Sequence, residues 1–510
     1  MSSLVQSVDW LAIAPPVIVA ATALIVLVAD LFVPDHRKQL IGWGAVAGLA
    51  AAVLMLLPLR HGNRSTFCLT TDHGACSYTA DHFTLAIQLL VLGGALLTAL
   101  LSMSETGGDR LPAGEYWFLL LASASGATLL PASRDLATLV VALEVASLPA
   151  FALVGLKRGN RLSSEAALKF FLSSVTATAV TLLGVSFVYA ATGTLHLGRI
   201  ATAQVDPQLN TLAEAGVVLT LVGFAFKTAA APFHFWVPDT YTGAPLPIAA
   251  YLSVIGKAVG FSGLILVTVV AFPGYSDIWG PAIAVLAALT MTVGNTAALR
   301  QRATRAHSAV RLLAWSSIGQ AGYLLVPIAA AGYTSDREIG STVAYALMYA
   351  VVNLGAFATV ALVARSRPGS RLTDHRGLYA RRPLTALALA FFLLCLAGLP
   401  PGIIGLFAKV TVFQSAVDAG LGWLAAVMAV NVAIALYYYL RWTAVLFRTP
   451  QETAAAATPA AATGSTTGET RTGPRIPVPL TLTIALAAAA GAVLSVAPQL
   501  VLHFASGSLF

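Results

Sequence analysis

The sequence predicts an all-α polytopic membrane protein. Of its 510 residues, 58% are hydrophobic and only 10% are charged, whereas soluble domains carry about 25% charged residues. The mean hydropathy is +0.82, and the apolar residues gather in runs that reach the roughly 20 residues needed to span a bilayer. This composition excludes a chain of soluble domains.

The spanning segments are predicted from the apolar runs, and the first run is too long, with no basic residues before it, for a cleavable signal. The fourth run is short. We expect about 14 transmembrane helices, near residues 10–32, 40–59, 82–103, 116–131, 136–156, 167–191, 212–237, 248–272, 279–299, 308–331, 340–364, 384–414, 419–445 and 477–503.

The basic residues indicate the orientation of these helices. They concentrate in alternate loops, such as the one that holds Lys157, Arg158 and Arg161, while the opposite loops hold few. Loops rich in Lys and Arg stay in the cytoplasm, so we expect both termini on the outer side. The net charge of +8 then reflects topology, and it indicates no nucleic-acid partner.

The three cysteines show no spacing typical of a metal site, and cysteines this scattered cannot hold an iron–sulfur cluster. Cys68 and Cys76 share a loop that we expect outside, where disulfides persist. Either a bridge or two free thiols fits the sequence there. Cys395 lies in the twelfth run and is expected to be a small packing residue.

The fifth run contains a carboxylate, Glu144, nine residues after Asp135. At about 1.5 Å per helical residue it lies roughly 13 Å deep, near the middle of the membrane. Acids at this depth mark ion paths or pair with cations. Glu144 is therefore predicted to be functional, with a structural salt bridge as the alternative.

The stretch from Gly223 to Gly260 carries two intramembrane lysines, Lys227 and Lys257, with Pro232, Pro238, Pro245 and Pro247 between them. A buried ammonium costs about 2.5–3.5 kcal/mol on insertion scales, and a broken helix is tolerated where its backbone is buried or lines a cavity. We expect a proton-transfer site here. His234 is either a side relay or a packed or capping histidine.

The twelfth run repeats this pattern, because Pro400 and Pro401 interrupt it and Lys409 follows. Interrupted helices of opposite direction, the seventh and the twelfth, suggest two inverted five-helix repeats. The predicted division is 1–115 (helices 1–3), 116–272 (first repeat, helices 4–8), 273–447 (second repeat, helices 9–13), 448–475 (flexible cytoplasmic linker) and 476–510 (helix 14).

Polar and aromatic residues near the tenth and thirteenth runs leave more than one interpretation open. His307, at the predicted inner end of the tenth run, is either a proton feeder or merely exposed. Ser316 and Ser317 could hold water on an interior face or bond the preceding helical turn. The stretch 437–442, YYYLRW, is typical of an aromatic anchor at the membrane interface.

Four stretches of the sequence are distinctive: SSEAALKFFL with the following span to TGTLHLG, FAFKTAAAPFHFWVPDTYTGAPLPIAAYLSVIGKAVGF, LLAWSSIGQAGY and LAGLPPGIIGLFAKVTVF. Together they resemble a known family, the subunit N branch of the antiporter-like membrane subunits of bacterial NADH:quinone oxidoreductase, respiratory complex I. The resemblance covers nearly the whole chain. The loop with both outer cysteines and the linker 449–475 are longer than this family leads us to expect.

The resemblance implies fourteen helices in two inverted repeats and proton translocation driven by distant quinone chemistry. It assigns proton transfer to Glu144, Lys227, Lys257 and Lys409. The chain would then be one subunit of a translocase in the bacterial plasma membrane, in contact with other membrane-arm subunits. NAD, FMN, iron–sulfur clusters and the quinone substrate would belong to partner subunits, and this chain would bind no cofactor.

The chemistry suggested by these residues is a proton relay, because a desolvated lysine approaches neutrality and a nearby carboxylate restores its charge. We expect Glu144 to modulate Lys227, Lys257 to relay and Lys409 to release. The nearest alternative is a subunit of a multi-subunit sodium/proton antiporter or of a membrane-bound hydrogenase. A membrane scaffold whose buried ions only join helices is the alternative from another class.

Overall fold

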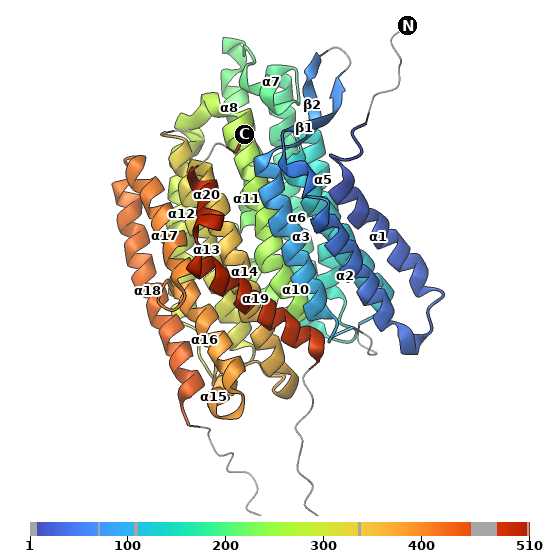
Figure 1. Cartoon of the computed structure of the whole chain (residues 1–510). Helices are drawn as coiled ribbons and strands as arrows, with labels where there is room; N and C mark the ends of the chain where they lie inside the picture. Colours follow the sequence, from blue (N-terminus) through green and yellow to red (C-terminus); the bar gives the residue numbers. More distant parts are fainter. Residues whose placement is uncertain (1–7, 70–71, 107–110, 335–337, 450–476, 507–508) are drawn as a thin grey trace, which may run out of the picture.

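The computed structural model describes residues 8–69, 72–106, 111–334, 338–449, 477–506 and 509–510. The predicted linker 448–475 falls almost entirely outside these residues. Within them the chain is a bundle of long helices with one small β-hairpin at its upper end in Figure 1.

The first half of the bundle runs from α1 to α11, and two π-helical turns, Leu252–Gly256 and Leu266–Ala271, flank α11. Its helices are α1 (Ala14–Asp30), α2 (Gln39–Leu54), α3 (His82–Ser102), α4 (Ala113–Leu129), α5 (Leu136–Gly155), α6 (Arg161–Thr192), α7 (Leu197–Ala201), α8 (Asn210–Thr228), α9 (Val237–Gly243), α10 (Leu246–Tyr251) and α11 (Lys257–Ile265).

The second half completes the bundle, and α19 crosses the face of α14 and α3 (Figure 1). Its helices are α12 (Ser276–Leu299), α13 (Ser308–Ala331), α14 (Ile339–Ser366), α15 (Leu378–Arg381), α16 (Pro383–Ala397), α17 (Ile403–Asp418), α18 (Gly422–Phe447), α19 (Val478–Val496) and α20 (Gln499–Ser506).

Eleven of the described helical segments are long and apolar enough to cross a membrane. Three other predicted spans correspond to shorter helices, α1 and α4 with 17 residues each and α16 with 15. The polytopic helical class is therefore confirmed, while the number fourteen stays a prediction. The division into two inverted repeats also stays a prediction.

The loop between α2 and α3 departs from the all-α prediction, because β1 (Arg64–Leu69) and β2 (Asp72–Ala80) pair there as an antiparallel hairpin. The register places Cys68 opposite Cys76, and the two form a disulfide. Of the two interpretations the sequence allowed, the bridge is the one observed. We call this end of the bundle the hairpin end; the C-terminal residues lie there too, since the Phe83 amide donates to the Leu509 carbonyl at 3.1 Å.

The opposite end carries the basic loops, and we call it the basic-loop end. An ion-pair network ties the two halves together there: Asp239 of α9 binds Lys169 of α6 at 2.9 Å and Arg311 of α13 at 2.7 Å. Lys169 also pairs with Glu165 at 2.8 Å. Because α6 and α9 belong to the first half and α13 to the second, Asp239 joins the halves.

Two helices break inside the bundle, where the prolines predicted breaks. The helix α8 ends at Thr228, and Ala229 adopts a left-handed conformation with φ of 65°. The helix α16 ends at Ala397, where Gly398 has φ of +84°. Proline provides no amide hydrogen for a helix to continue, so the last carbonyls of both helices are left without helical partners.

The innermost helices are α13 and α14. In their spans 94% and 89% of the residues are buried, compared with 22% in α19. The helix α14 packs against α10 and α3 of the first half and against α16, α17 and α19 of the second. The helix α14 therefore contacts both halves of the bundle.

Candidate functional site

Lys227 lies in the last turn of α8 and is buried among aromatic rings. Its Nζ lies 5.0 Å from the ring centre of Phe151, 5.1 Å from that of Phe170 and 5.8 Å from that of Phe226. A cation within about 6 Å of a ring face is attracted by the ring quadrupole. The rings thus hold the ammonium in a space from which α5 and α6 exclude bulk water.

Glu144 lies on α5 and does not form a direct ion pair with Lys227. Its Oε1 instead accepts a 2.6 Å hydrogen bond from the Thr178 hydroxyl of α6. Glu144 is half-buried, and its neighbours Val141 and Val145 are 58% and 40% exposed. The carboxylate therefore lies at the edge of the bundle. It and its partner Thr178 belong to α5 and α6, the two helices that supply Phe151 and Phe170 to the surroundings of Lys227.

A small cavity of about 20 Å³ borders Lys227, Ser147 and Tyr251. A space this size holds a single water, which needs about 10–15 Å³. The Tyr251 hydroxyl donates to Ser123 Oγ at 3.0 Å on the cavity wall. A water there would have both an ammonium and hydroxyl groups as partners.

Lys257 begins α11 directly after the first π-helical turn, and it is buried. Its Nζ donates to the carbonyl of Thr228 at 3.3 Å. Thr228 is the last residue of α8, so Lys257 binds the open end of the helix that carries Lys227. A cation at a helix C-terminus is stabilised by the helix dipole.

Lys409 lies on α17 and reaches back across the second break. Its Nζ donates to the carbonyls of Leu396 and Ala397, both at 2.7 Å. These are the last residues of α16, so Lys409 binds an open helix end just as Lys257 does. A cavity of about 20 Å³ lies beside the ammonium, and the ring of Tyr323 lies 5.9 Å from Nζ.

In the part of the chain that the structure describes, none of the three buried lysines has a carboxylate within 4.0 Å. Their partners are rings and backbone carbonyls. An ion pair would hold the ammonium protonated, whereas a carbonyl also accepts a hydrogen bond from the neutral amine. The lysines are thus placed to gain and lose protons without breaking a salt bridge.

His234 lies in the segment between α8 and α9 and is half-buried. Its ring centre lies 5.7 Å from that of Trp315 on α13. Its Nδ1 is buried without a hydrogen-bond partner among the described residues. The ring contact fits the packing interpretation, and the relay role of His234 stays a prediction.

The stretch 437–442 is not an interfacial anchor. Of its aromatic residues, Tyr438, Tyr439 and Trp442 are buried, while Tyr437 is 58% exposed. The Tyr439 hydroxyl bonds Ser316, which lies on α13. These aromatic rings therefore pack α18 against the core instead of holding it at the membrane surface.

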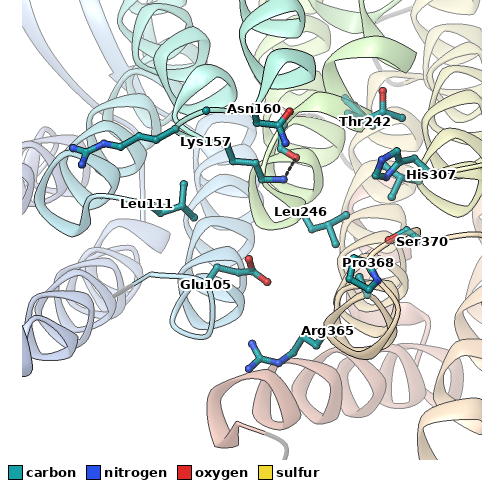
Figure 2. A pocket seen from close by; sticks show the side chains of 16 residues that line it. Glu105, Leu111, Lys157, Asn160, Thr242, Leu246, His307, Arg365, Pro368 and Ser370 are labelled. Carbon is teal, nitrogen blue, oxygen red and sulfur yellow. Dashed lines mark hydrogen bonds between the residues drawn. The ribbon is translucent and has the colours of Figure 1, made fainter. Parts of the chain in front are cut away.

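A cavity of about 840 Å³ opens at the basic-loop end, where the two halves meet. Figure 2 shows Lys157 and Glu105 on its first-half side and His307 and Arg365 on its second-half side. Lys157 Nζ donates to the carbonyl of Ala244 at 3.1 Å. Burial, together with the charges of Lys157 and Arg311, lowers the pKa of His307, so His307 is neutral at neutral pH.

Sequence reasoning placed the four charged residues but missed Asp239 and the tyrosines around the central helices. Asp239 follows the predicted break and has no nearby charge in the sequence, because its partners Lys169 and Arg311 are about 70 residues away on either side. No local signal marks it. Tyr345 and Tyr349 lie within the predicted apolar run 340–364, where no local signal distinguishes them.

Comparison with known proteins places the chain in a family. The family described as NADH:quinone oxidoreductase/Mrp antiporter, TM, matches residues 133–435. A curated relative from Streptomyces griseus, NADH-quinone oxidoreductase subunit N 2, is 75% identical over 514 residues, covering 100% of this chain and 95% of the relative. The subunit N of Salinispora tropica is 47% identical, covering 88% and 87% of the two chains.

Solved structures agree with this fold. A chain of respiratory complex I from Thermus thermophilus with bound aureothin matches with a TM-score of 0.75 and 32% identity, covering 97% of this chain and 100% of that one. A chain of the Mrp complex from a Dietzia species matches with a TM-score of 0.80 but only 21% identity, covering 97% and 96%, which shows the fold alone. On the curated relatives and the Thermus chain, this chain belongs to the NADH-quinone oxidoreductase subunit N family of antiporter-like membrane proteins.

Proposed function

We infer that this chain is a membrane-arm subunit of NADH:quinone oxidoreductase that translocates protons while partner subunits pass electrons from NADH to quinone. The observation that carries this inference is the pair of lysines at the two helix breaks. Lys257 binds the open end of α8 and Lys409 binds that of α16. A scaffold would be expected to pair such costly charges with carboxylates, and these have none within 4.0 Å in the described structure.

The proposed relay comprises Lys227, Lys257 and Lys409. Glu144 lies on α5, the helix that also supplies Phe151 to the surroundings of Lys227, and a movement of its charge toward or away from the ammonium would load or release a proton. Lys257 shares the break of α8 with Lys227, since it binds the carbonyl of the residue that follows Lys227. Lys409 is the terminal site, from which the proton leaves.

The proton would move by exchange of N–H and O–H bonds with single waters. The cavities of about 20 Å³ beside Lys227 and Lys409 are each large enough for one water molecule. When the ammonium gives a proton to water, the remaining amine keeps N–H groups that can stay bonded to the helix carbonyls. The break geometry therefore supports both protonation states.

The partner assignments follow from the family. NAD, FMN, iron–sulfur clusters and the quinone site belong to other subunits in this proposal, as the relatives are subunits of NADH-quinone oxidoreductase. We propose that the chain lies in the bacterial plasma membrane with both termini outside, as the distribution of basic residues predicts. A reporter that works only outside should be active after Phe510; an inactive fusion in an assembled protein would reverse every directional statement.

The sodium/proton antiporter and hydrogenase alternatives have weaker support. The Mrp chain and a chain of the archaeal membrane-bound sulfane sulfur reductase share the fold at 21% and 22% identity. Identity of 75% to a subunit N over the full chain favours the oxidoreductase. The subunits that co-purify with this chain in mild detergent discriminate the two directly.

The function is tested by reconstituting the purified complex in proteoliposomes and measuring proton uptake driven by NADH. The Lys257→Met variant removes the relay ammonium but keeps the length of the side chain. Its matched control is Lys38→Met, because Lys38 is a surface lysine that pairs with Asp35 at 3.3 Å. We expect Lys257→Met to assemble and to lose proton uptake while the control keeps it; normal uptake by Lys257→Met would refute the relay.

A further inference from the structure

Buried hydroxyl groups lead inward from the large cavity at the basic-loop end. Tyr241 of α9 lines this cavity, but its hydroxyl is buried and has no hydrogen-bond partner among the described residues. Buried polar groups nearly always bond to protein or to ordered water. The hydroxyl of Tyr241 therefore marks a place for water at the inner wall of the cavity, beside the Ser317 side chain of α13.

Ser317 connects Tyr241 to the centre of the bundle. It also neighbours Tyr349 of α14, whose hydroxyl donates to the carbonyl of Ser253 at 3.2 Å. Ser253 belongs to the π-helical turn that ends directly before Lys257. A π-helical turn inside an α-helix frees backbone groups and often accompanies function.

Asn353 extends this polar row by one helical turn. Its Nδ2 donates to Ser253 Oγ at 2.6 Å, while its Oδ1 is buried without a partner in the described structure. This second unpaired polar atom also indicates room for a water bond. The row thus runs from the cavity wall to the turn directly before Lys257.

Tyr349 faces the second break as well. It lines the cavity of about 20 Å³ that borders Lys409, together with Gln320 and Tyr345. Tyr349 is therefore a junction, which contacts the turn before Lys257 on one side and the water-sized space beside Lys409 on the other.

We propose that Tyr241, Ser317 and Tyr349 form the proton path from the basic-loop cavity to Lys257 and Lys409. This rests on the proposed function, because protons released at the hairpin end must be taken up at the opposite end. Each hydroxyl oxygen accepts a proton from the preceding water and gives its own proton to the next group. Along the hydroxyl groups only O–H bonds form and break, and at the end of the path an O–H bond of the last donor breaks as an N–H bond forms on the neutral lysine amine, which then carries the charge.

The cavity suits the start of such a path. Its wall carries the cations Lys157 and Arg365, the carboxylate Glu105 and the neutral imidazole of His307. The carboxylate and the imidazole can each accept a proton from solvent, and the two cations keep it from being held there. Uptake at this wall delivers protons next to Tyr241.

Ring packing is the competing explanation for the tyrosines, and Tyr→Phe variants separate the two. The Tyr241 ring lies 6.2 Å from that of Phe357, a contact that phenylalanine would keep. Tyr349→Phe removes only the hydroxyl. Ser317→Ala removes a hydroxyl that otherwise bonds its own helical turn, at Ala314, so the helix loses nothing else. The matched control is Tyr116→Phe. The Tyr116 hydroxyl is also buried and forms a 2.7 Å hydrogen bond with the Ser102 hydroxyl, but neither residue belongs to the path.

The experiment measures NADH-driven proton uptake in inverted vesicles that contain the whole complex and expose the basic-loop side to the buffer. A positioned proton-transfer group contributes about 100-fold or more, and water can replace part of it, so we expect Tyr349→Phe and Ser317→Ala to slow uptake by roughly tenfold at pH 8. Lower buffer pH should restore much of the rate, because the proton supply limits it. Tyr116→Phe should pump normally at every pH.

Two results would overturn the path: uptake at the control rate, or a loss that does not change with buffer pH, as a structural defect would give. The amount of the chain in the purified complex shows assembly; if Tyr349→Phe fails to assemble, Ser317→Ala decides. Lys257→Met is measured in the same vesicles. If it stops uptake while both hydroxyl variants pump normally, the path alone is wrong; if it pumps normally, the proposed function fails as well.

Discussion

Replacement of Lys409 separates its charge from its ability to release a proton. Its ammonium makes two hydrogen bonds of 2.7 Å to the end of α16, and a bond to a charged group contributes about 1.5–3 kcal/mol. Lys409→Met therefore loses about 3–6 kcal/mol of bonding but also avoids burying a cation, which costs about 2.5–3.5 kcal/mol. The net loss of stability lies between about −0.5 and 3.5 kcal/mol, small enough for the subunit to assemble.

Lys409→Arg keeps the positive charge and N–H donors for the Leu396 and Ala397 carbonyls. A guanidinium stays protonated in proteins, so this variant preserves the structural contact and blocks proton release. We expect both Lys409 variants to assemble and both to take up fewer protons per NADH oxidised than wild type.

The assay is proton uptake by proteoliposomes or inverted vesicles, divided by NADH:quinone turnover, with Lys38→Arg as the surface control. The thermal stability of the purified complex checks the magnitude worked out above. Normal pumping by Lys409→Arg would show that the lysine is a structural cation and would remove it from the relay.

Three other outcomes can be measured on the same complex. If Glu144 acts on Lys227 through charge, Glu144→Gln combined with Lys227→Met should cost less pumping than the sum of the single losses; additive losses would show independent action. The cysteines of the Cys68–Cys76 bridge are separated by 8 residues, so reducing the bridge should destabilise the hairpin by about 2.5 kcal/mol through chain entropy. The backbone amides of the hairpin should then exchange hydrogen faster while pumping is unchanged; unchanged amide exchange would contradict this. The pKa of His307 is lowered in the fold, so its neutral form stabilises the fold above about pH 6.5, and this contribution is lost as the pH falls through the lowered pKa. Acidification should therefore lower the Tm of wild type more than that of His307→Asn. Equal shifts in Tm would argue against this role of His307.

Much of the fold could be predicted from the sequence because a bilayer imposes strong rules. Every backbone group in the membrane must be bonded internally, so apolar runs become helices. The prolines also located both breaks: α8 ends at Thr228, shortly before Pro232, and α16 ends at Ala397, shortly before Pro400. The buried charges stood out for the same reason, since lysine and glutamate are costly there.

The partners of those charges were decided by the tertiary structure. Lys257 binds a carbonyl 29 residues away, and Glu144 binds Thr178 of the next helix. Backbone carbonyls at a helix break have no signature in the sequence, because every residue carries one. The pairing of Cys68 with Cys76 likewise depended on a hairpin register that the loop sequence did not reveal.

The sequence by itself determined the membrane class, the breaks and the residues that carry charge, because these follow from the cost of polar groups in lipid. Only the tertiary structure decided which apolar faces meet protein and which meet lipid. Tyr439 and Trp442 were predicted at the interface but lie in the core, and Tyr349 contacts the surroundings of two lysines. Lipid and protein interior are both apolar, so the periodicity that separates core from surface in water carries little information here.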